Sequence, residues 1–228
     1  MDFLCESLLQ ALRLIFTYDP EVYVTIWTSL KVSSLAVLFA SLFGISAGLV
    51  VGTCRFAGRR LVITLLNTLM ALPTVVVGLV CYGFLSRSGP LGHLGLLFTN
   101  QAVVLGLTIL ATPVIANYTI GALSAADGRI LPTAQTLGAG SVQSALLLLQ
   151  EIRFGAMAAV IAGFGRVIAE VGIAMMLGGN IRGLTRTMTT AIALETSKGE
   201  FAFGLALGIF LMTVALIVNL LLNLLQQR

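Results

Sequence analysis

Two charged residues, Arg166 and Glu170, lie inside segment 154–177, which is otherwise apolar and rich in glycine and alanine. The segment is long enough to cross roughly 30 Å of hydrocarbon as a helix. Charged side chains at that depth are costly and usually serve a function. Because the two residues are one helical turn apart, they can pair. We interpret them as a structural or gate-supporting pair, and direct contact between Arg166 and an anionic ligand is the alternative.

A polar stretch, 178–200, follows this segment and is rich in hydroxyl groups. Its candidate binding residues are Asn180, Arg182, Thr185, Thr187, Thr189 and Thr190. Guanidinium and hydroxyl groups can donate hydrogen bonds to a tetrahedral oxyanion, and they supply no acidic metal site. These residues could therefore contact an oxyanion or a soluble protein. A solvated loop with helix caps would contain the same residue types, so both interpretations stay open.

Other kinds of chemistry lack the residues that they need. Neither Lys31 nor Lys198 follows a glycine, so the chain has no glycine-rich loop ending in Gly-Lys-Ser or Gly-Lys-Thr that could hold a nucleotide. The single histidine, His93, has no partner at ligand spacing, and the three cysteines are far apart. An intramembrane enzyme would need a catalytic cluster, which the membrane segments lack. We predict no enzyme activity, bound metal or cofactor for this chain.

The composition predicts an all-α polytopic membrane protein. Of the 228 residues, 58% are hydrophobic and 10% are charged, and the mean hydropathy is +1.04. No water-soluble core could hide so much apolar surface. The 13 basic and 9 acidic residues give a net charge of +4. Because no run of Lys and Arg is long enough to follow a nucleic acid, we interpret the basic residues as helix-end anchors and topology signals.

Five apolar segments are long enough to be transmembrane helices. They cover approximately residues 32–54, 61–85, 102–123, 154–177 and 201–225. We predict one transmembrane domain, 32–225, preceded by an interfacial segment, 1–31, with a short amphipathic helix and an aromatic belt. In the second span Pro73 removes a backbone hydrogen bond, so it predicts a hinge or pore-lining bend or, equally, an ordinary kink.

Segment 129–151 is too polar and too broken by proline and glycine to cross a bilayer, yet it keeps an apolar side. A short amphipathic helix there is suited to lie in a groove on a partner. The alternative is a connector that folds on its own bundle. Arg55, Arg59 and Arg60 fill the short turn between the first two spans, which favours the cytoplasmic side for that turn. With five spans, segment 129–151 and the C-terminus are then cytoplasmic, and the N-terminus is outside.

The same segment resembles the cytoplasmic EAA loop of the transmembrane subunit of bacterial ABC importers. The core Thr136-Leu137-Gly138-Ala139 fits that loop, whereas Pro132 and Thr133 replace its usual Glu and first Ala. A longer resemblance, to the permease subunit of tungstate-type oxyanion importers and their molybdate and sulfate relatives, is carried by GFGRVIAEVGIAMMLGGNI (163–181), TRTMTTAIALETSKGEF (185–201), LPTVVVGLV (72–80) and GPLG (89–92).

This resemblance implies the ABC importer permease fold of the molybdate or methionine type, in the bacterial cytoplasmic membrane. It implies ATP-driven import of a tetrahedral oxyanion, tungstate first, with molybdate, sulfate or another small solute as alternatives. The implied partners are a separate ATP-binding subunit, an extracytoplasmic oxyanion-binding protein and a second copy of the chain. A passive channel would need no coupling loop. The residues expected to couple ATP hydrolysis to transport are Thr133, Ala134, Gln135, Leu137, Gly138 and Ala139.

Overall fold

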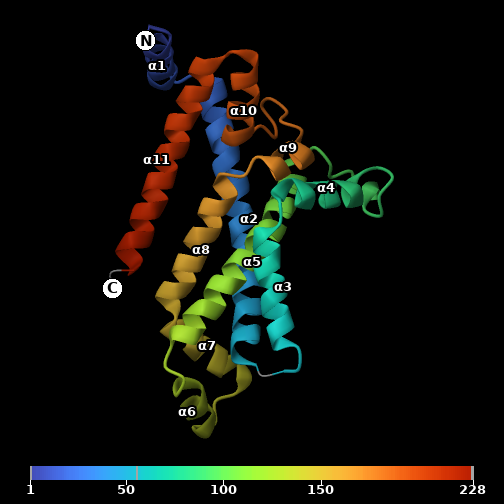
Figure 1. Ribbon diagram of the computed structural model, residues 1–228, viewed down its shortest axis with the longest axis vertical. Helices are drawn as coiled ribbons and strands as arrows, with labels where there is room; N and C mark the ends of the chain where they lie inside the picture. The colour runs from blue at the N-terminus through green and yellow to red at the C-terminus, as the bar shows by residue number, and fades with distance from the viewer. Residues whose placement is uncertain (1, 55, 227–228) are drawn as a thin grey trace.

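The computed structural model describes residues 2–54 and 56–226, and all regular structure within them is helical (Figure 1). Arg55, one of the three arginines of the predicted cytoplasmic turn, lies outside the described residues. The helices are α1 (Asp2–Phe16), α2 (Pro20–Thr53), α3 (Arg59–Ala71), α4 (Thr74–Leu85), the 3₁₀ turn η1 (Gly92–Leu94), α5 (Asn100–Ala125), α6 (Ile130–Thr136), α7 (Ser141–Glu151), α8 (Arg153–Ile168), α9 (Gly172–Gly178), α10 (Met188–Lys198) and α11 (Phe201–Gln226).

The long helix α2 begins before the first predicted span. Asp19 caps it by accepting the N–H groups of Glu21 and Val22 at 3.0 and 3.2 Å, and Pro20 occupies the first turn. Proline is favoured there because its fixed φ suits a helix and its missing N–H has no intrahelical partner anyway. The predicted interfacial segment, 1–31, therefore consists of α1 and the first turns of α2.

Helices α2, α5 and α8 form the core of the molecule. Its buried side chains include Val32, Ala36 and Ala40 of α2, Leu107, Leu110 and Ile115 of α5, and Ala159 of α8. Glycines of α2 bring it close to α5, since a Cβ at Gly48 would lie 2.6 Å from the Cβ of Thr119. Apolar helices in lipid associate through this kind of packing at small residues.

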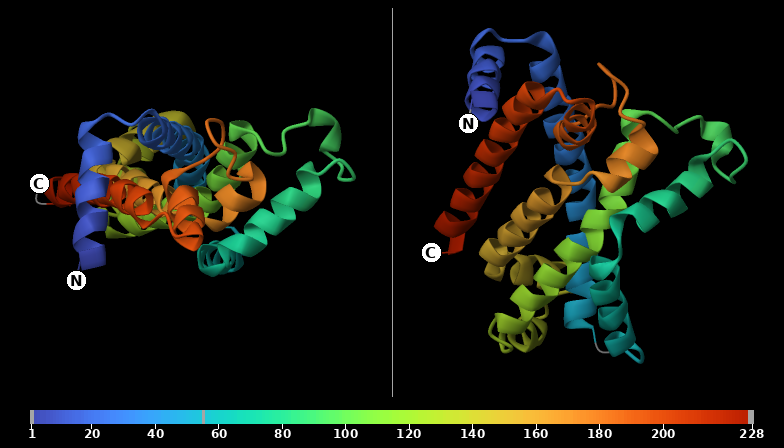
Figure 2. Two further views of the ribbon diagram at one scale, coloured as in Figure 1. Left: turned by 90° about the horizontal axis from the view of Figure 1, so that it is seen from above. Right: turned by 45° about the horizontal axis from the view of Figure 1, so that its top comes forward.

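The second predicted span is sharply bent at Pro73. Helices α3 and α4 meet there at 98°, and α4 projects sideways from the bundle as an arm (Figures 1 and 2). Pro73 is extended, with φ −60° and ψ 124°, and it precedes the first turn of α4. A proline cannot continue the hydrogen bonding of α3, and it restricts the residue before it to extended angles. This bend is much larger than an ordinary kink.

The structure divides the fourth predicted span and adds a helix after it. Helix α8 ends at Ile168, and the short helix α9 follows after a break at residues 169–171. The polar stretch 178–200 contains α10, whose N-terminus is capped by Thr187. Sequence patterns missed α10 because its faces show no clear separation of polar and apolar residues.

Three of the described helices are long and apolar enough to cross a membrane: α2, α5 and α11 over Phe201–Leu221. Two bent pairs, α3 with α4 and α7 with α8, pass the same test together, so the count rises to five if each pair is one span. Helices α6 and α7 lie at the same end of the molecule as the α2–α3 turn, and α1 and α10 lie at the other (Figure 1).

Candidate functional site

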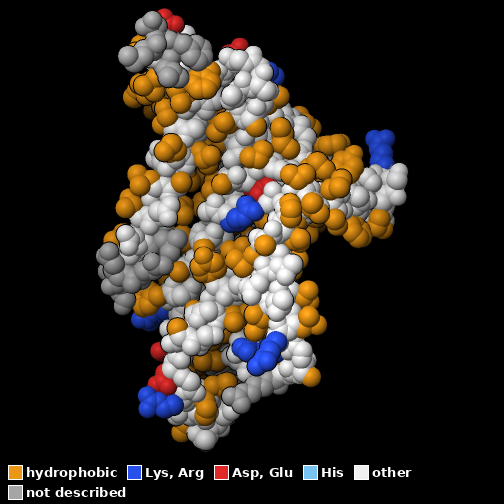
Figure 3. All heavy atoms as spheres, viewed as in Figure 1, with side chains coloured by type: hydrophobic (Ala, Val, Ile, Leu, Met, Phe, Trp, Pro, Cys, Tyr) orange, Lys and Arg blue, Asp and Glu red, His pale blue; other side chains and the backbone are white. Residues whose placement is uncertain are grey.

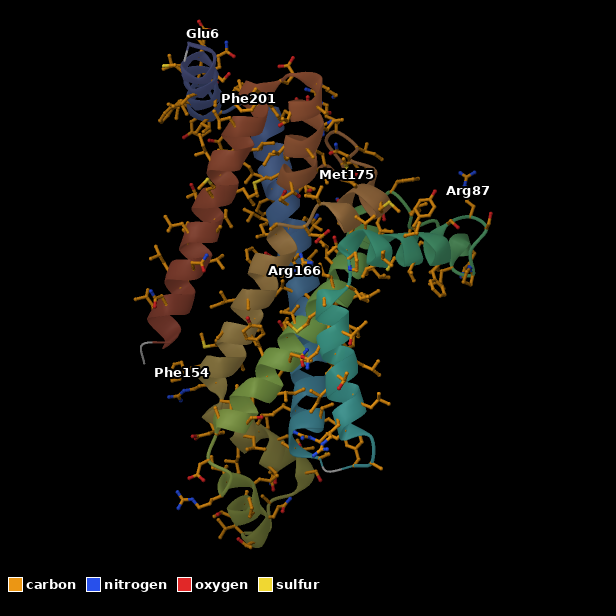
Figure 4. The ribbon with its side chains drawn as sticks, viewed as in Figure 1. Glu6, Arg87, Phe154, Arg166, Met175 and Phe201 are labelled. Carbon is orange, nitrogen blue, oxygen red and sulfur yellow. The ribbon has the colours of Figure 1, made fainter. Side chains whose placement is uncertain are left out.

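Arg166 and Glu170 form an ion pair in the middle of the molecule (Figure 4). Arg166 Nη1 lies 3.0 Å from Glu170 Oε2. The two side chains differ in burial, with 3% of the Glu170 side chain and 37% of the Arg166 side chain exposed. Figure 3 shows a basic and an acidic group side by side at this height, on a face that is otherwise largely apolar and uncharged. The predicted pairing is therefore present, although Glu170 lies beyond the end of α8 and not on it.

Glu170 joins the ends of three helices. Its second carboxylate oxygen, Oε1, accepts the backbone N–H of Ile173 in the first turn of α9 at 3.2 Å. Its backbone carbonyl accepts the hydroxyl of Thr189 in α10 at 2.7 Å. The arm is close as well, because a Cβ at Gly172 would lie 3.1 Å from Thr74 Oγ1 and 3.3 Å from Glu170 Oε1. The bend at Pro73 thus adjoins the ion pair, and α4 packs against α9.

The four threonines predicted to bind an oxyanion, Thr185, Thr187, Thr189 and Thr190, are buried and hydrogen-bonded within the fold. Thr185 donates to the carbonyl of Gly178, and Thr187 and Thr190 bond each other's backbone N–H groups at the start of α10. Asn180, with φ +50°, exchanges hydrogen bonds with Thr190. Of the six predicted binding residues only Arg182 is exposed. These contacts fold the loop, and the role of the residues toward an oxyanion stays a prediction.

The arginines of this loop form ion pairs with acidic residues that the sequence patterns did not indicate. Glu21 of α2 pairs with Arg182 and, at 2.9 Å, with Arg186. Arg186 also lies 3.1 Å from Glu195 of α10, which in turn pairs with Lys198. Only 8% of the Arg186 side chain is exposed. Because Glu21 is far away in sequence from both arginines, no local spacing could have indicated this network, which ties α2 to α10.

The loop between α6 and α7 makes the tight turn that glycine favours. Gly138 has φ +85°. Its N–H donates to the carbonyl of Gln135, and the N–H of Ala139 donates to the carbonyl of Ala134, each at 3.0 Å. This is the Schellman arrangement of a helix C-terminus, in which a left-handed glycine satisfies the last carbonyls. Ala134 is buried, whereas 82% of Leu137 is exposed at the tip.

No protein-family model matches the chain. The chain is nevertheless similar in sequence to several curated proteins. The tungstate uptake system permease protein TupB of Peptoclostridium acidaminophilum is 36% identical over all of both chains. A probable anion ABC transporter permease of Haloferax volcanii is 42% identical over 84% of each chain. The chain belongs to this family of ABC-transporter permeases. The molybdenum transport permease ModB of Escherichia coli is also 31% identical to this permease, over 80% of it and 83% of ModB.

The fold of the permease is that of a solved importer. A chain of the MetNI methionine ABC transporter, in inward-facing conformations, superimposes with a TM-score of 0.73 at 17% identity. The match covers 91% of the permease and 95% of that chain. The predicted ABC importer permease fold is confirmed, as is the predicted multi-pass membrane protein.

The permease exposes an apolar surface at its α6–α7 end. It consists of Leu137, Val142, Leu146 and Leu147, all of which are exposed. Arg129 forms a bidentate ion pair with Asp127 at the base of α6, and this pair holds the pKa of the Asp127 carboxyl below its usual value. Both residues stay charged at neutral pH. The predicted coupling residues thus follow this charged pair in the chain, and one of them, Leu137, is part of the apolar surface.

Across residues 2–54 and 56–226, no three His, Cys, Asp or Glu side chains come together as metal ligands would. The sequence predicts no metal, cofactor or catalytic group, and the family relatives are named as transport permeases. The groups that the fold brings together are an ion pair, a charge network and a coupling loop.

Proposed function

We propose that this permease is the transmembrane subunit of an ATP-driven importer that moves a tetrahedral oxyanion, tungstate, into the cell. The observation that carries the proposal is the 36% identity to a tungstate uptake permease over the full length of both chains. Molybdate is the second candidate because of the 31% identity to a molybdenum permease, and sulfate is the third because of the 28% identity to a sulfate permease.

The energy comes from a separate subunit in this proposal. ATP is bound and hydrolysed on that partner, so the permease itself needs neither a cofactor nor a catalytic group. The exposed Leu137 and its apolar neighbours on α7 dock in a groove of the ATP-binding subunit, as an amphipathic helix does in other recognition modes. Because only the buried Ile152 separates α7 from α8, a push on α6 and α7 is transmitted to the helix that carries Arg166.

The transport pathway lies between two copies of the permease, because five spans are too few for a single copy to enclose a pathway. An external oxyanion-binding protein delivers the substrate and does most of the selection. The Arg166–Glu170 pair, next to the Pro73 bend, supports the gate. Arg166 keeps part of its side chain exposed, which supports the alternative that it also attracts a passing oxyanion.

A strain that lacks this permease is expected to lose high-affinity tungstate uptake. The complete reconstituted importer is expected to hydrolyse ATP faster when its binding protein carries tungstate, because the loaded protein favours closure of the ATPase subunits. Uptake of labelled tungstate, with excess molybdate or sulfate as competitor, ranks the three anions. Unchanged tungstate uptake, together with lost uptake of sulfate, an amino acid or a metal cation, would contradict the substrate and leave the fold untouched.

The proposed orientation places the N-terminus outside and the α6–α7 end inside the cell. The chain offers a matched pair of probes, because Cys5 and Cys54 are both exposed and lie near opposite ends of the molecule. In intact cells a membrane-impermeant thiol reagent is expected to label Cys5 and not Cys54, and permeabilised cells should label both. The single variants Cys5→Ser and Cys54→Ser identify each signal. Labelling of Cys54 in intact cells would show that the topology is the reverse of the one proposed.

A further inference from the structure

An apolar groove of about 950 Å³ lies between α2, α3 and α5. Its walls include Phe39 and Phe43 from α2, Leu66 and Leu69 from α3, and Leu105 and Ile109 from α5. Helix α3 contacts α5 but has no fully buried residue within the described structure, and Leu69, on the side that faces the groove, is 44% exposed. Contact with hydrocarbon in the groove would cover that side.

One end of the groove is polar. Lys31, Asn100 and Gln101 line it there. Lys31 is exposed, and among the described residues it has no ion-pair partner. Asn100 Oδ1 is buried without a hydrogen-bond donor. An unpaired cation and an unsatisfied acceptor at one mouth of an apolar groove indicate a ligand with a charged head and an apolar tail.

The height and length of the groove match one leaflet of a bilayer. Trp27 precedes Lys31 by one helical turn and is exposed, and exposed tryptophans gather at the membrane–water interface. From Lys31 to Phe43 α2 rises about 18 Å at about 1.5 Å per residue. Half of a roughly 30 Å hydrocarbon core is about 15 Å. The polar end therefore lies at headgroup level, and the apolar end reaches the middle of the bilayer.

We propose that this groove is a binding site for one anionic phospholipid. An acyl chain lies between α3 and the α2–α5 pair, the phosphate pairs with Lys31, and a hydroxyl of the headgroup donates to Asn100 Oδ1. An apolar helix of a second copy is a poorer occupant, because it would bury Lys31 without a counter-ion. The site is independent of the transported anion. It would hold α3, and with it the Pro73 bend, in position.

The test uses the single tryptophan of the chain. In a Trp27→Phe background, Phe39→Trp places a fluorophore in the groove, and Leu38→Trp places one on the neighbouring exposed position of α2 outside it. The full-length permease, with its partner subunits, is reconstituted in phosphatidylcholine vesicles that contain brominated phosphatidylglycerol or brominated phosphatidylcholine. Subtracting the fluorescence of the Trp27→Phe parent leaves only the fluorescence of the introduced tryptophan. Phe43→Trp, deeper in the groove, is a second probe should the first variant not fold.

Brominated phosphatidylglycerol is expected to quench the groove probe with about fivefold higher apparent affinity than brominated phosphatidylcholine, the size of effect that one basic side chain has at an anionic membrane surface. The Leu38→Trp probe should show no such preference. Lys31→Gln should abolish the preference, and Arg87→Gln, which removes an exposed cation outside the groove, should leave it. Equal quenching by the two lipids, a preference that survives Lys31→Gln, or a groove probe that neither lipid quenches would each overturn the proposal.

Discussion

Glu170→Ala is expected to destabilise the assembled permease by about 3 kcal/mol, and Arg166→Ala by about 4 kcal/mol, within the range for breaking a buried ion pair. Glu170→Ala leaves Arg166 unpaired but partly exposed, and it removes the acceptor of the Ile173 N–H. Arg166→Ala costs more because it leaves a carboxylate with 3% exposure and no cation. Thermal denaturation of the purified assembly and its level in membranes measure both losses.

The double variant Arg166→Ala, Glu170→Ala separates coupling from simple damage. The loss of stability in the double variant should be smaller, by at least about 1 kcal/mol, than the sum of the losses in the two single variants. The reason is that the double variant leaves neither charge unpaired. Glu170→Gln is the matched control for the cap, because its amide oxygen can still accept the Ile173 N–H but carries no charge. Strict additivity of the two alanine changes would show that Arg166 and Glu170 act independently.

Gly138→Val is expected to uncouple ATP hydrolysis from transport while the helical bundle still assembles. A side chain in the left-handed region costs about 1–2 kcal/mol, and Gly138 has φ +85° in the turn between α6 and α7. That cost corresponds to roughly a five- to thirtyfold loss of the native turn. Transport per ATP hydrolysed, measured in vesicles with the complete importer, should fall by a similar factor.

Gly140→Val is the matched control for this change. Gly140 has φ −69° and ψ 170°, angles that valine adopts easily. The nearest atom to a Cβ there is Gln143 Oε1 at 4.0 Å, so no clash arises. Coupling should therefore survive Gly140→Val. Normal transport by a well-expressed Gly138→Val permease would show that coupling does not require the glycine turn.

Local signals predicted the features that depend on residues close in sequence. The i, i+4 spacing of Arg166 and Glu170 predicted their ion pair, which the structure shows at 3.0 Å. Gly138 indicated a tight turn, and its positive φ confirms it. The Asp19-Pro20 pair is a strong helix-start signal that could have shown where α2 begins, inside the predicted interfacial segment.

The sequence by itself determined the class of protein, since apolar segments of this length are stable only with a membrane around them and their backbone groups paired in helices. It also determined the α6–α7 turn. Only the tertiary structure decided the rest. The network of Glu21 with Arg182 and Arg186 joins residues that lie far apart in the chain. The 98° bend at Pro73 depends on the packing of α4 against α9, because a proline breaks a helix without setting its new direction. The groove beside Lys31 exists because α3, α2 and α5 meet at a distance that no local pattern encodes.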